Sequence, residues 1–110
     1  LVGFKRAYNI TKQVADDHSV DATLFKEKEE EALFGAYESK KELFFSAMRE
    51  RDYDNAISIL VIFKESIDRY FDKVFVMDKD EKIKNNRLAL LKKIKDMFLA
   101  YADFSKIRIE

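Results

Sequence analysis

Residues 54–74, DNAISILVIFKESIDRYFDKV, carry the clearest amphipathic pattern in the chain. Apolar side chains recur there every three or four positions, which is the spacing of one face of an α-helix. The stretch predicts a helix that runs to about Val76, and Asp52 or Asp54 is expected to cap its start by accepting free backbone N–H groups. Its buried stripe is predicted to contain Ala56, Leu60, Phe63, Ile67, Tyr70, Phe71 and Val74.

The same periodicity predicts helices on both sides of this stretch. The first covers about residues 3–17, with Tyr8 on its apolar side, and the second covers about residues 26–50, with Leu43 on its apolar stripe. A last helix or helix pair follows the polar turn at residues 77–80 and runs to about Phe104. Two Gly and no Pro in 110 residues disfavour an all-β fold, which needs many turns. Short connections between long helices indicate an all-α fold, an antiparallel bundle of about four to five helices.

The composition limits what the chain can do. A length of 110 residues predicts a single domain, and 47% hydrophobic residues argue against a disordered chain. Without Cys, the chain holds no disulfide and no thiolate zinc site. The 21 basic and 21 acidic side chains balance, which excludes a grossly basic nucleic-acid tail. Because the first residue is not Met, we expect a piece of a longer polypeptide.

The charged side chains are unevenly distributed. Residues 21–54 carry a net charge of −4, whereas residues 79–110 carry +4. A basic face on the last helix could follow a phosphate backbone, or it could be an ordinary solvated surface. Arg87 differs from the other basic residues, because helical spacing places it on the apolar face with Leu91 and Ile94. It is expected either to pair with a carboxylate or reach solvent, or to bind a phosphate or a base edge.

The acidic residues and the single His form no recognisable catalytic or metal-binding motif. Residues 78–80 could begin a calcium loop, but the sixth and twelfth positions hold Ile83 and Ala89 instead of Gly and Glu. His18 stands at an expected helix end, where its positive charge would be favoured. The carboxylates of residues 27–31 are expected to form an exposed acidic face. We therefore expect neither catalytic residues nor a metal site here.

Six segments follow the patterns of one protein family. Residues 67–77, IDRYFDKVFVM, resemble the pattern VDxFFDxVxVM, and residues 85–91, NNRLALL, contain the segment NRLALL. The others are FKRAYNI at 4–10, similar to FKRVxNI; VDATLF at 20–25, similar to VDPALF; EAL at 31–33, similar to EKAL; and AYADFS at 100–105, similar to RVADFS. In this order and over nearly its whole length, the chain resembles the C-terminal, DALR-type anticodon-binding domain of bacterial glycyl-tRNA synthetase β subunits.

This resemblance implies a role in translation. The chain would be a helical C-terminal domain that binds the anticodon arm of tRNA(Gly) and is not an enzyme by itself. The parent would be a cytoplasmic glycine–tRNA ligase of the α₂β₂ type, with the α subunit and the rest of the β subunit as protein partners. ATP and Mg²⁺ would act in the parent reaction, whereas this domain is expected to need no cofactor and to contact no membrane.

The matching motifs imply five RNA-binding candidates. Arg6 and Asn9 lie in FKRAYNI, Lys73 lies in IDRYFDKVFVM, and Asn86 and Arg87 lie in NNRLALL. Arg and Lys would meet phosphates or guanine edges, and Asn would meet base edges. The alternatives are helix capping or a turn contact for Asn9 and Asn86, and an ordinary surface charge for Arg6 and Lys73.

A second hypothesis is a docking module that joins the α and β subunits or packs against other β domains. Such a module would need an exposed apolar patch. The apolar residues that fall off the predicted stripes, and could form this patch, are Ile57, Val61, Phe75, Ile107 and Ile109.

Overall fold

The regular structure of the described residues is helical. The computed structural model describes residues 2–12 and 19–109, with side chains for residues 5–12 and 19–102. The main helices are α1 (Val2–Ile10), α2 (Lys28–Arg49), α3 (Tyr53–Lys73) and α4 (Glu81–Ile109), and a short 3₁₀ helix, η1 (Ala22–Leu24), precedes α2. This confirms the predicted all-α fold. The end of the first predicted helix, residues 13–17, and His18 lie outside the described residues.

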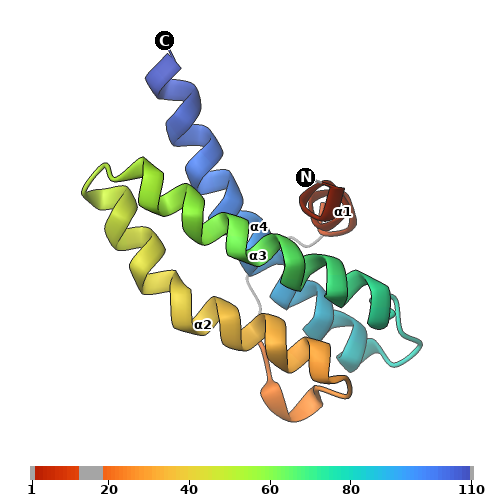
Figure 1. Cartoon of the computed structure of the whole chain (residues 1–110). Helices are drawn as coiled ribbons and strands as arrows, with labels where there is room; N and C mark the ends of the chain where they lie inside the picture. The colour runs from red at the N-terminus through yellow and green to blue at the C-terminus, as the bar shows by residue number, and fades with distance from the viewer. Residues whose placement is uncertain (1, 13–18, 110) are drawn as a thin grey trace.

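Helices α2 and α3 form an antiparallel hairpin (Figure 1). At the end of α2, Arg51 adopts a left-handed φ of 59°, its N–H donates to the carbonyl of Met48, and the N–H of Asp52 donates to the carbonyl of Ala47. These two bonds form a Schellman motif, which satisfies carbonyl groups at the helix end and reverses the chain. The Asp52 side chain then accepts a hydrogen bond from the N–H of Asn55, so Asp52 is the cap of α3.

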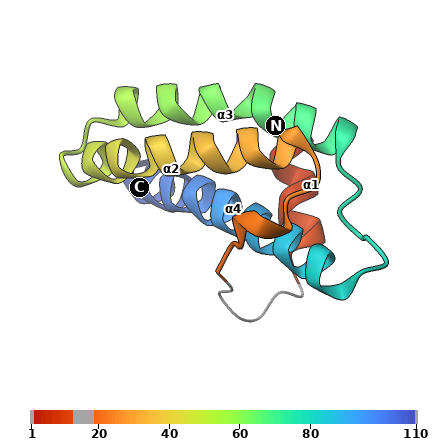
Figure 2. The same ribbon diagram turned by 90° about the horizontal axis from the view of Figure 1, so that it is seen from below.

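The remaining two helices pack on the hairpin in different directions. Helix α4 runs beside the hairpin, and its C-terminal turns extend past it (Figure 1). Helix α1 lies across α3 and α4: Figure 1 shows it end-on, and Figure 2 shows it crossing the direction of the other helices. The bundle is therefore formed by α2, α3 and α4, with α1 as a transverse helix near the α3–α4 connection.

The core confirms most of the predicted stripe of α3 and changes its end. Phe63, Ile67 and Tyr70 are fully buried, whereas Phe71 is half-buried. The helix ends at Lys73 and not near Val76, because the backbone of the next residue is extended. The other core side chains come from α1 (Ala7), α2 (Leu33, Phe44, Ala47, Met48) and α4 (Leu90, Leu91, Ile94, Met97, Phe98).

Two residues assigned to buried stripes are exposed. Leu43 of α2 and Tyr8 of α1 both lie largely at the surface. The buried stripe of α2 centres on Leu33, Phe44 and Ala47, so Leu43 falls at its edge. Helical periodicity gives the direction of a side chain around the helix axis only to about a quarter turn. It therefore does not decide whether a residue at the edge of an apolar stripe is buried or exposed.

Replacing Phe63 with Ala should lower the free energy of unfolding by about 3–5 kcal/mol, because it leaves a cavity at a fully buried ring. Urea denaturation followed by circular dichroism measures this change. Val61→Ala is the control, since Val61 lies on the same helix but is 62% exposed, and it should change stability by no more than about 0.5 kcal/mol. Equal, small effects of both substitutions would contradict the described core.

Candidate nucleic-acid interface

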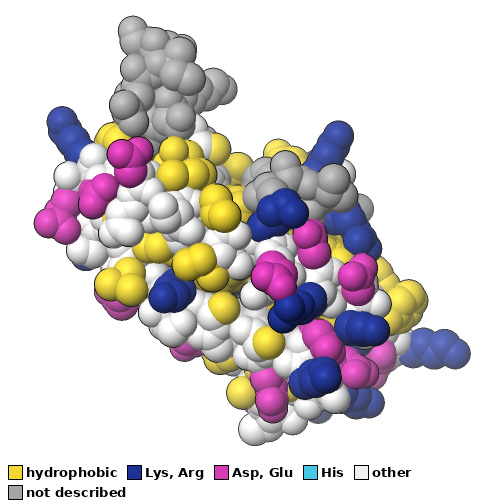
Figure 3. Space-filling view, in the orientation of Figure 1, with side chains coloured by type: hydrophobic (Ala, Val, Ile, Leu, Met, Phe, Trp, Pro, Cys, Tyr) yellow, Lys and Arg dark blue, Asp and Glu magenta, His cyan; other side chains and the backbone are white. Residues whose placement is uncertain are grey.

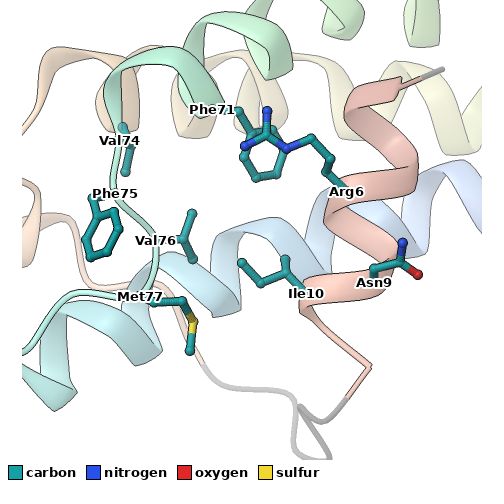
Figure 4. Close-up of a pocket in the computed structure, with 8 residues that line it drawn as sticks. All are labelled: Arg6, Asn9, Ile10, Phe71, Val74, Phe75, Val76 and Met77. Atoms are coloured by element: carbon teal, nitrogen blue, oxygen red, sulfur yellow. The ribbon is translucent and has the colours of Figure 1, made fainter.

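An open cleft of about 500 Å³ lies between α1 and the segment that follows α3. Figure 4 shows that Arg6, Asn9 and Ile10 belong to α1, whereas Phe71 belongs to α3. The opposite side is formed by residues 74–77, at the start of the non-helical segment 74–80, which we call the linker (Figure 4). The volume lies within the range of small-ligand sites, and the cleft is open enough to admit part of a larger molecule.

The linker presents alternate side chains to the core and to the surface. Val74 and Val76 are buried, whereas Phe75 and Met77 are exposed. The alternation begins at Val74, whose backbone is extended and therefore turns successive side chains to opposite sides. Phe75 is 71% exposed, so a large aromatic ring stands at the cleft with its surface in solvent.

Three of the five predicted RNA-binding residues lie at or beside this cleft. The Arg6 guanidinium carbon is 4.1 Å from the centroid of the Phe71 ring, which is a cation–π contact that orients the side chain across the cleft (Figure 4). Asn9 is exposed at the rim on the next turn of α1. Lys73 is the exposed last residue of α3 and directly precedes the linker.

Asn86, the fourth predicted residue, makes an internal contact instead of facing the cleft. Its side-chain oxygen accepts a hydrogen bond from the N–H of Asp21 at 2.7 Å, and its side-chain nitrogen donates to the carbonyl of Asp21 at 3.0 Å. The residue is buried. Asn86 therefore attaches the segment before α2 to α4, which corresponds to the turn-contact alternative and makes its amide unavailable to a base edge in this conformation.

Arg87, the fifth, is also buried and pairs with carboxylates. Its Nη2 donates to Oε1 of Glu30 at 3.0 Å, and its Nη1 donates to the carbonyl of Phe75 at 2.6 Å and lies 3.5 Å from Oδ2 of Asp78. This confirms the expected carboxylate pairing of a guanidinium on an apolar helix face. Arg87 thus contacts the linker from inside the molecule, on the protein side of the cleft wall.

The burial of Glu30 is the main difference from the predicted acidic face. Its Oε1 also accepts the backbone N–H groups of Lys26 and Glu27 at 3.0 Å each. These bonds satisfy free donors at the start of α2, as the reaching-back carboxylate of a capping box does. The face predicted at residues 27–31 is therefore interrupted, because Glu30 points into the molecule while Glu31 remains exposed.

The buried surroundings shift the pKa of Arg87 and the pKa of Tyr70. Desolvation alone lowers the pKa of Arg87, but the hydrogen bond and charge of Glu30 more than offset it, so that its pKa is raised. Burial raises the pKa of Tyr70, the charge of Glu30 adds to this, and Arg87 opposes it. The Tyr70 hydroxyl, which lies 3.5 Å from the Arg87 carbonyl oxygen, is therefore neutral near physiological pH.

Sequence reasoning did not identify Phe75 as part of the cleft. We grouped it with Ile57 and Val61 as an exposed apolar patch, and all three are exposed. However, Ile57 and Val61 line a separate apolar groove of about 330 Å³ between α3 and α4, whereas Phe75 belongs to the cleft. The four residues 74–77, VFVM, are all apolar, so no alternation of polar and apolar residues marked Phe75 as the side chain that faces out. The side chains of Ile107 and Ile109 lie outside those described.

The surface carries both signs of charge. On the face in Figure 3, basic and acidic side chains are interspersed, and apolar side chains lie between them. Within residues 2–12 and 19–109, no group of three or more His, Cys, Asp and Glu side chains could hold a metal ion. The helices in the same ranges are too short or too polar to cross a membrane.

Comparisons with known proteins agree on one family. The DALR anticodon binding domain family matches residues 1–103. The chain is 41% identical over 107 residues to the glycine–tRNA ligase beta subunit of Sulfurihydrogenibium sp. (strain YO3AOP1), and 39% identical over 107 residues to that of Thermotoga neapolitana. Each alignment covers 97% of this chain and 16% of the relative. The chain therefore spans about one sixth of the length of these curated relatives.

Removing the Asn86 amide should release the segment before α2. We expect Asn86→Ala to lower the free energy of unfolding by about 1–3 kcal/mol, because two hydrogen bonds are lost. Amide exchange at Asp21 should also become faster. Asn85→Ala is the matched control, since Asn85 is exposed, and both measurements should stay near wild type. Protection of the Asp21 amide that survives Asn86→Ala would contradict the described contact.

Proposed function

The chain belongs to the DALR anticodon binding domain family, and on this premise we propose that it binds the anticodon arm of a tRNA through the cleft between α1 and the linker. The observation that carries the proposal is one open cleft whose lining combines an exposed aromatic ring, Phe75, with the side chains of Arg6 and Asn9. Proteins recognise single-stranded RNA loops by stacking unpaired bases on aromatic or Arg planes and by hydrogen bonding to base edges. The cleft offers both kinds of group.

The cleft residues would divide these roles by chemistry. Phe75 would stack on an unpaired base of the loop. Arg6 and Lys73 would contact phosphates or a guanine edge, and Asn9 would contact a base edge. Asn86 and Arg87 are left out of this set of contacts, because their polar groups already bind within the protein.

The absence of net charge implies modest affinity for RNA by this domain alone. Weak binding suits a domain that adds one contact to a larger synthetase–tRNA interface, because linkage within one polypeptide raises the effective concentration of the second contact. The length of the relatives supports this arrangement, since the chain corresponds to 16% of each.

We further propose that the parent protein is the β subunit of a cytoplasmic glycine–tRNA ligase, that this is its C-terminal domain, and that tRNA(Gly) and the α subunit are its partners. The identities of 39–41% to proteins named glycine–tRNA ligase beta subunit support this proposal. ATP and Mg²⁺ would act in the reaction of the parent enzyme. We assign no step of the aminoacylation reaction to this chain.

The direct test is fluorescence anisotropy of the 110-residue chain with a labelled tRNA(Gly) anticodon stem-loop. A second stem-loop with a scrambled anticodon is titrated in parallel, at low and at near-physiological salt. Tighter binding of the glycine anticodon would support base readout, whereas equal binding with a steep salt dependence would indicate backbone contact alone. A folded chain that binds neither RNA, even at low salt, would contradict the proposal.

Reversing the charge of Lys73 should weaken this binding without unfolding the domain. We expect Lys73→Glu to lower affinity about tenfold at low salt and to reduce the dependence of log affinity on log salt by about 0.7, the value for one phosphate contact on a single strand. Arg49→Glu is the matched control. It makes the same charge change at the exposed last residue of α2, at the far end of the hairpin. Equal losses in both variants would remove Lys73 from the site.

The Phe75 ring should contribute through stacking. Phe75→Ala should weaken stem-loop binding by about 1–3 kcal/mol, the range measured for one stacked base. Phe75→Tyr keeps the ring and should bind like wild type, whereas Phe75→Leu keeps apolar character without the ring and should resemble Phe75→Ala. If Phe75→Leu binds the stem-loop as tightly as wild type, then no base stacks on this residue.

The groove between α3 and α4 favours a second candidate function, docking to another protein surface. It is lined mainly by apolar side chains, and Val61 stands exposed at it. Co-purification of the α subunit with the chain, lost in Val61→Asp, would support docking. This outcome is independent of RNA binding, because the groove and the cleft share no residue.

A further inference from the structure

The linker forms one wall of the cleft, and helical hydrogen bonds hold only its two ends: the N–H of Val74 donates to the Tyr70 carbonyl, and the Asp80 carbonyl accepts the N–H of Lys84. Residues 74–80 lie between the end of α3 and the start of α4. Val74 and Val76 pack into the core, which orients Phe75 and Met77 outward. Apolar packing alone sets a position loosely, because dispersion contacts have no preferred direction. A directional contact to the backbone of this wall would fix the position of the Phe75 ring.

Arg87 supplies such a contact from behind the wall. Its Nη1 donates to the Phe75 carbonyl at 2.6 Å and lies 3.5 Å from the Asp78 carboxylate. One guanidinium nitrogen therefore contacts the linker at two points, three residues apart. The Arg87 side chain is only 4% exposed, so water cannot readily take its place at the Phe75 carbonyl.

Glu30 holds the other side of the same guanidinium. Its Oε1 accepts the Nη2 group of Arg87 at 3.0 Å and the two backbone N–H groups at the start of α2. The orientation of Arg87 is thereby coupled to the first turn of α2, which is part of the α2–α3 hairpin. The chain of contacts runs from α2 through Glu30 and Arg87 to the linker.

We propose that Glu30 and Arg87 are positioning residues for the RNA-binding cleft. They hold the linker in the position in which the Phe75 ring can contact an RNA base. The inference rests on the function proposed above. Neither residue touches RNA in this scheme. Their role is to keep the wall of the cleft at a constant distance from Arg6 and Asn9 of α1.

The details of the pair favour this role over a purely stabilising one. Oε2 of Glu30 and Nε of Arg87 are buried without a hydrogen-bond partner among the described residues. A buried ion pair whose polar atoms are incompletely satisfied contributes little net stability, and apolar residues of similar size often replace such pairs without loss. Apolar replacements would not, however, provide a donor for the Phe75 carbonyl. Stability and linker position can therefore be separated by mutation.

The test is the double variant Glu30→Met with Arg87→Met, which removes one charge of each sign and leaves the net charge unchanged. The matched control is Glu65→Met with Arg69→Met, which removes an exposed ion pair from α3. We expect the buried double variant to fold, to exchange the amides of residues 75–80 at least about tenfold faster than wild type, and to bind the anticodon stem-loop about tenfold more weakly, the equivalent of one stacked base. The control should match wild type in both measurements.

Arg87→Lys provides the second variant. A lysine keeps the charge opposite Glu30, but its single ammonium group lacks the fork that contacts Glu30 and Phe75 at once. We therefore expect Arg87→Lys to fold, to exchange the amide hydrogens of the linker faster than wild type and to bind RNA weakly. This variant tests the proposal even if the double variant does not fold.

The two readouts separate failure of this inference from failure of the proposed function. Wild-type RNA affinity in a folded double variant or in Arg87→Lys would overturn the inference, whether linker exchange is fast or slow, and would leave the proposed function intact. A wild-type chain that does not bind the stem-loop would overturn the proposed function, and the role of the linker in RNA binding with it.

Discussion

The buried contact between Glu30 and Arg87 joins parts of the molecule that are distant in the sequence. It connects the first turn of α2, the first half of α4 and the linker between α3 and α4. A charge removed from water must be paired and hydrogen-bonded, which limits where these two side chains can lie. The planar fork of the guanidinium meets both the Glu30 carboxylate and the Phe75 carbonyl, and it thereby links the linker to the first turn of α2.

The cleft is formed by two kinds of structure. On one side, Arg6 and Asn9 project from a regular helix, α1, which packs across α3 and α4. On the other side, Phe75 and Met77 project from a linker whose conformation depends on contacts to its backbone and on two buried valines. Binding residues are often found on irregular segments held by a rigid scaffold, because such segments place side chains where helices cannot. Here the scaffold acts through Arg87.

Sequence reasoning recovered the helices better than the site. The stripe Ala56, Leu60, Phe63, Ile67 and Tyr70 is buried as predicted, since local periodicity reports directly on one face of a helix. The position of Arg87 on an apolar helix face was also predicted, and it implied a partner because a buried guanidinium must be paired. The partner was not visible, because Glu30 lies 57 positions away in the chain and its carboxylate resembles its exposed neighbours in sequence.

From the amino-acid sequence we predicted the all-α fold, the approximate positions of the helices, the buried stripe of α3 and the family that the chain resembles. These properties depend on residues a few positions apart or on motifs read in order. The folded structure was needed to see that α1 lies across the other helices, that Asn86 and Arg87 face inward, and that Phe75 lines one cleft with Arg6 and Asn9. These contacts join residues separated by tens of positions, so they are selected by packing and desolvation in the assembled core and not by local sequence preference.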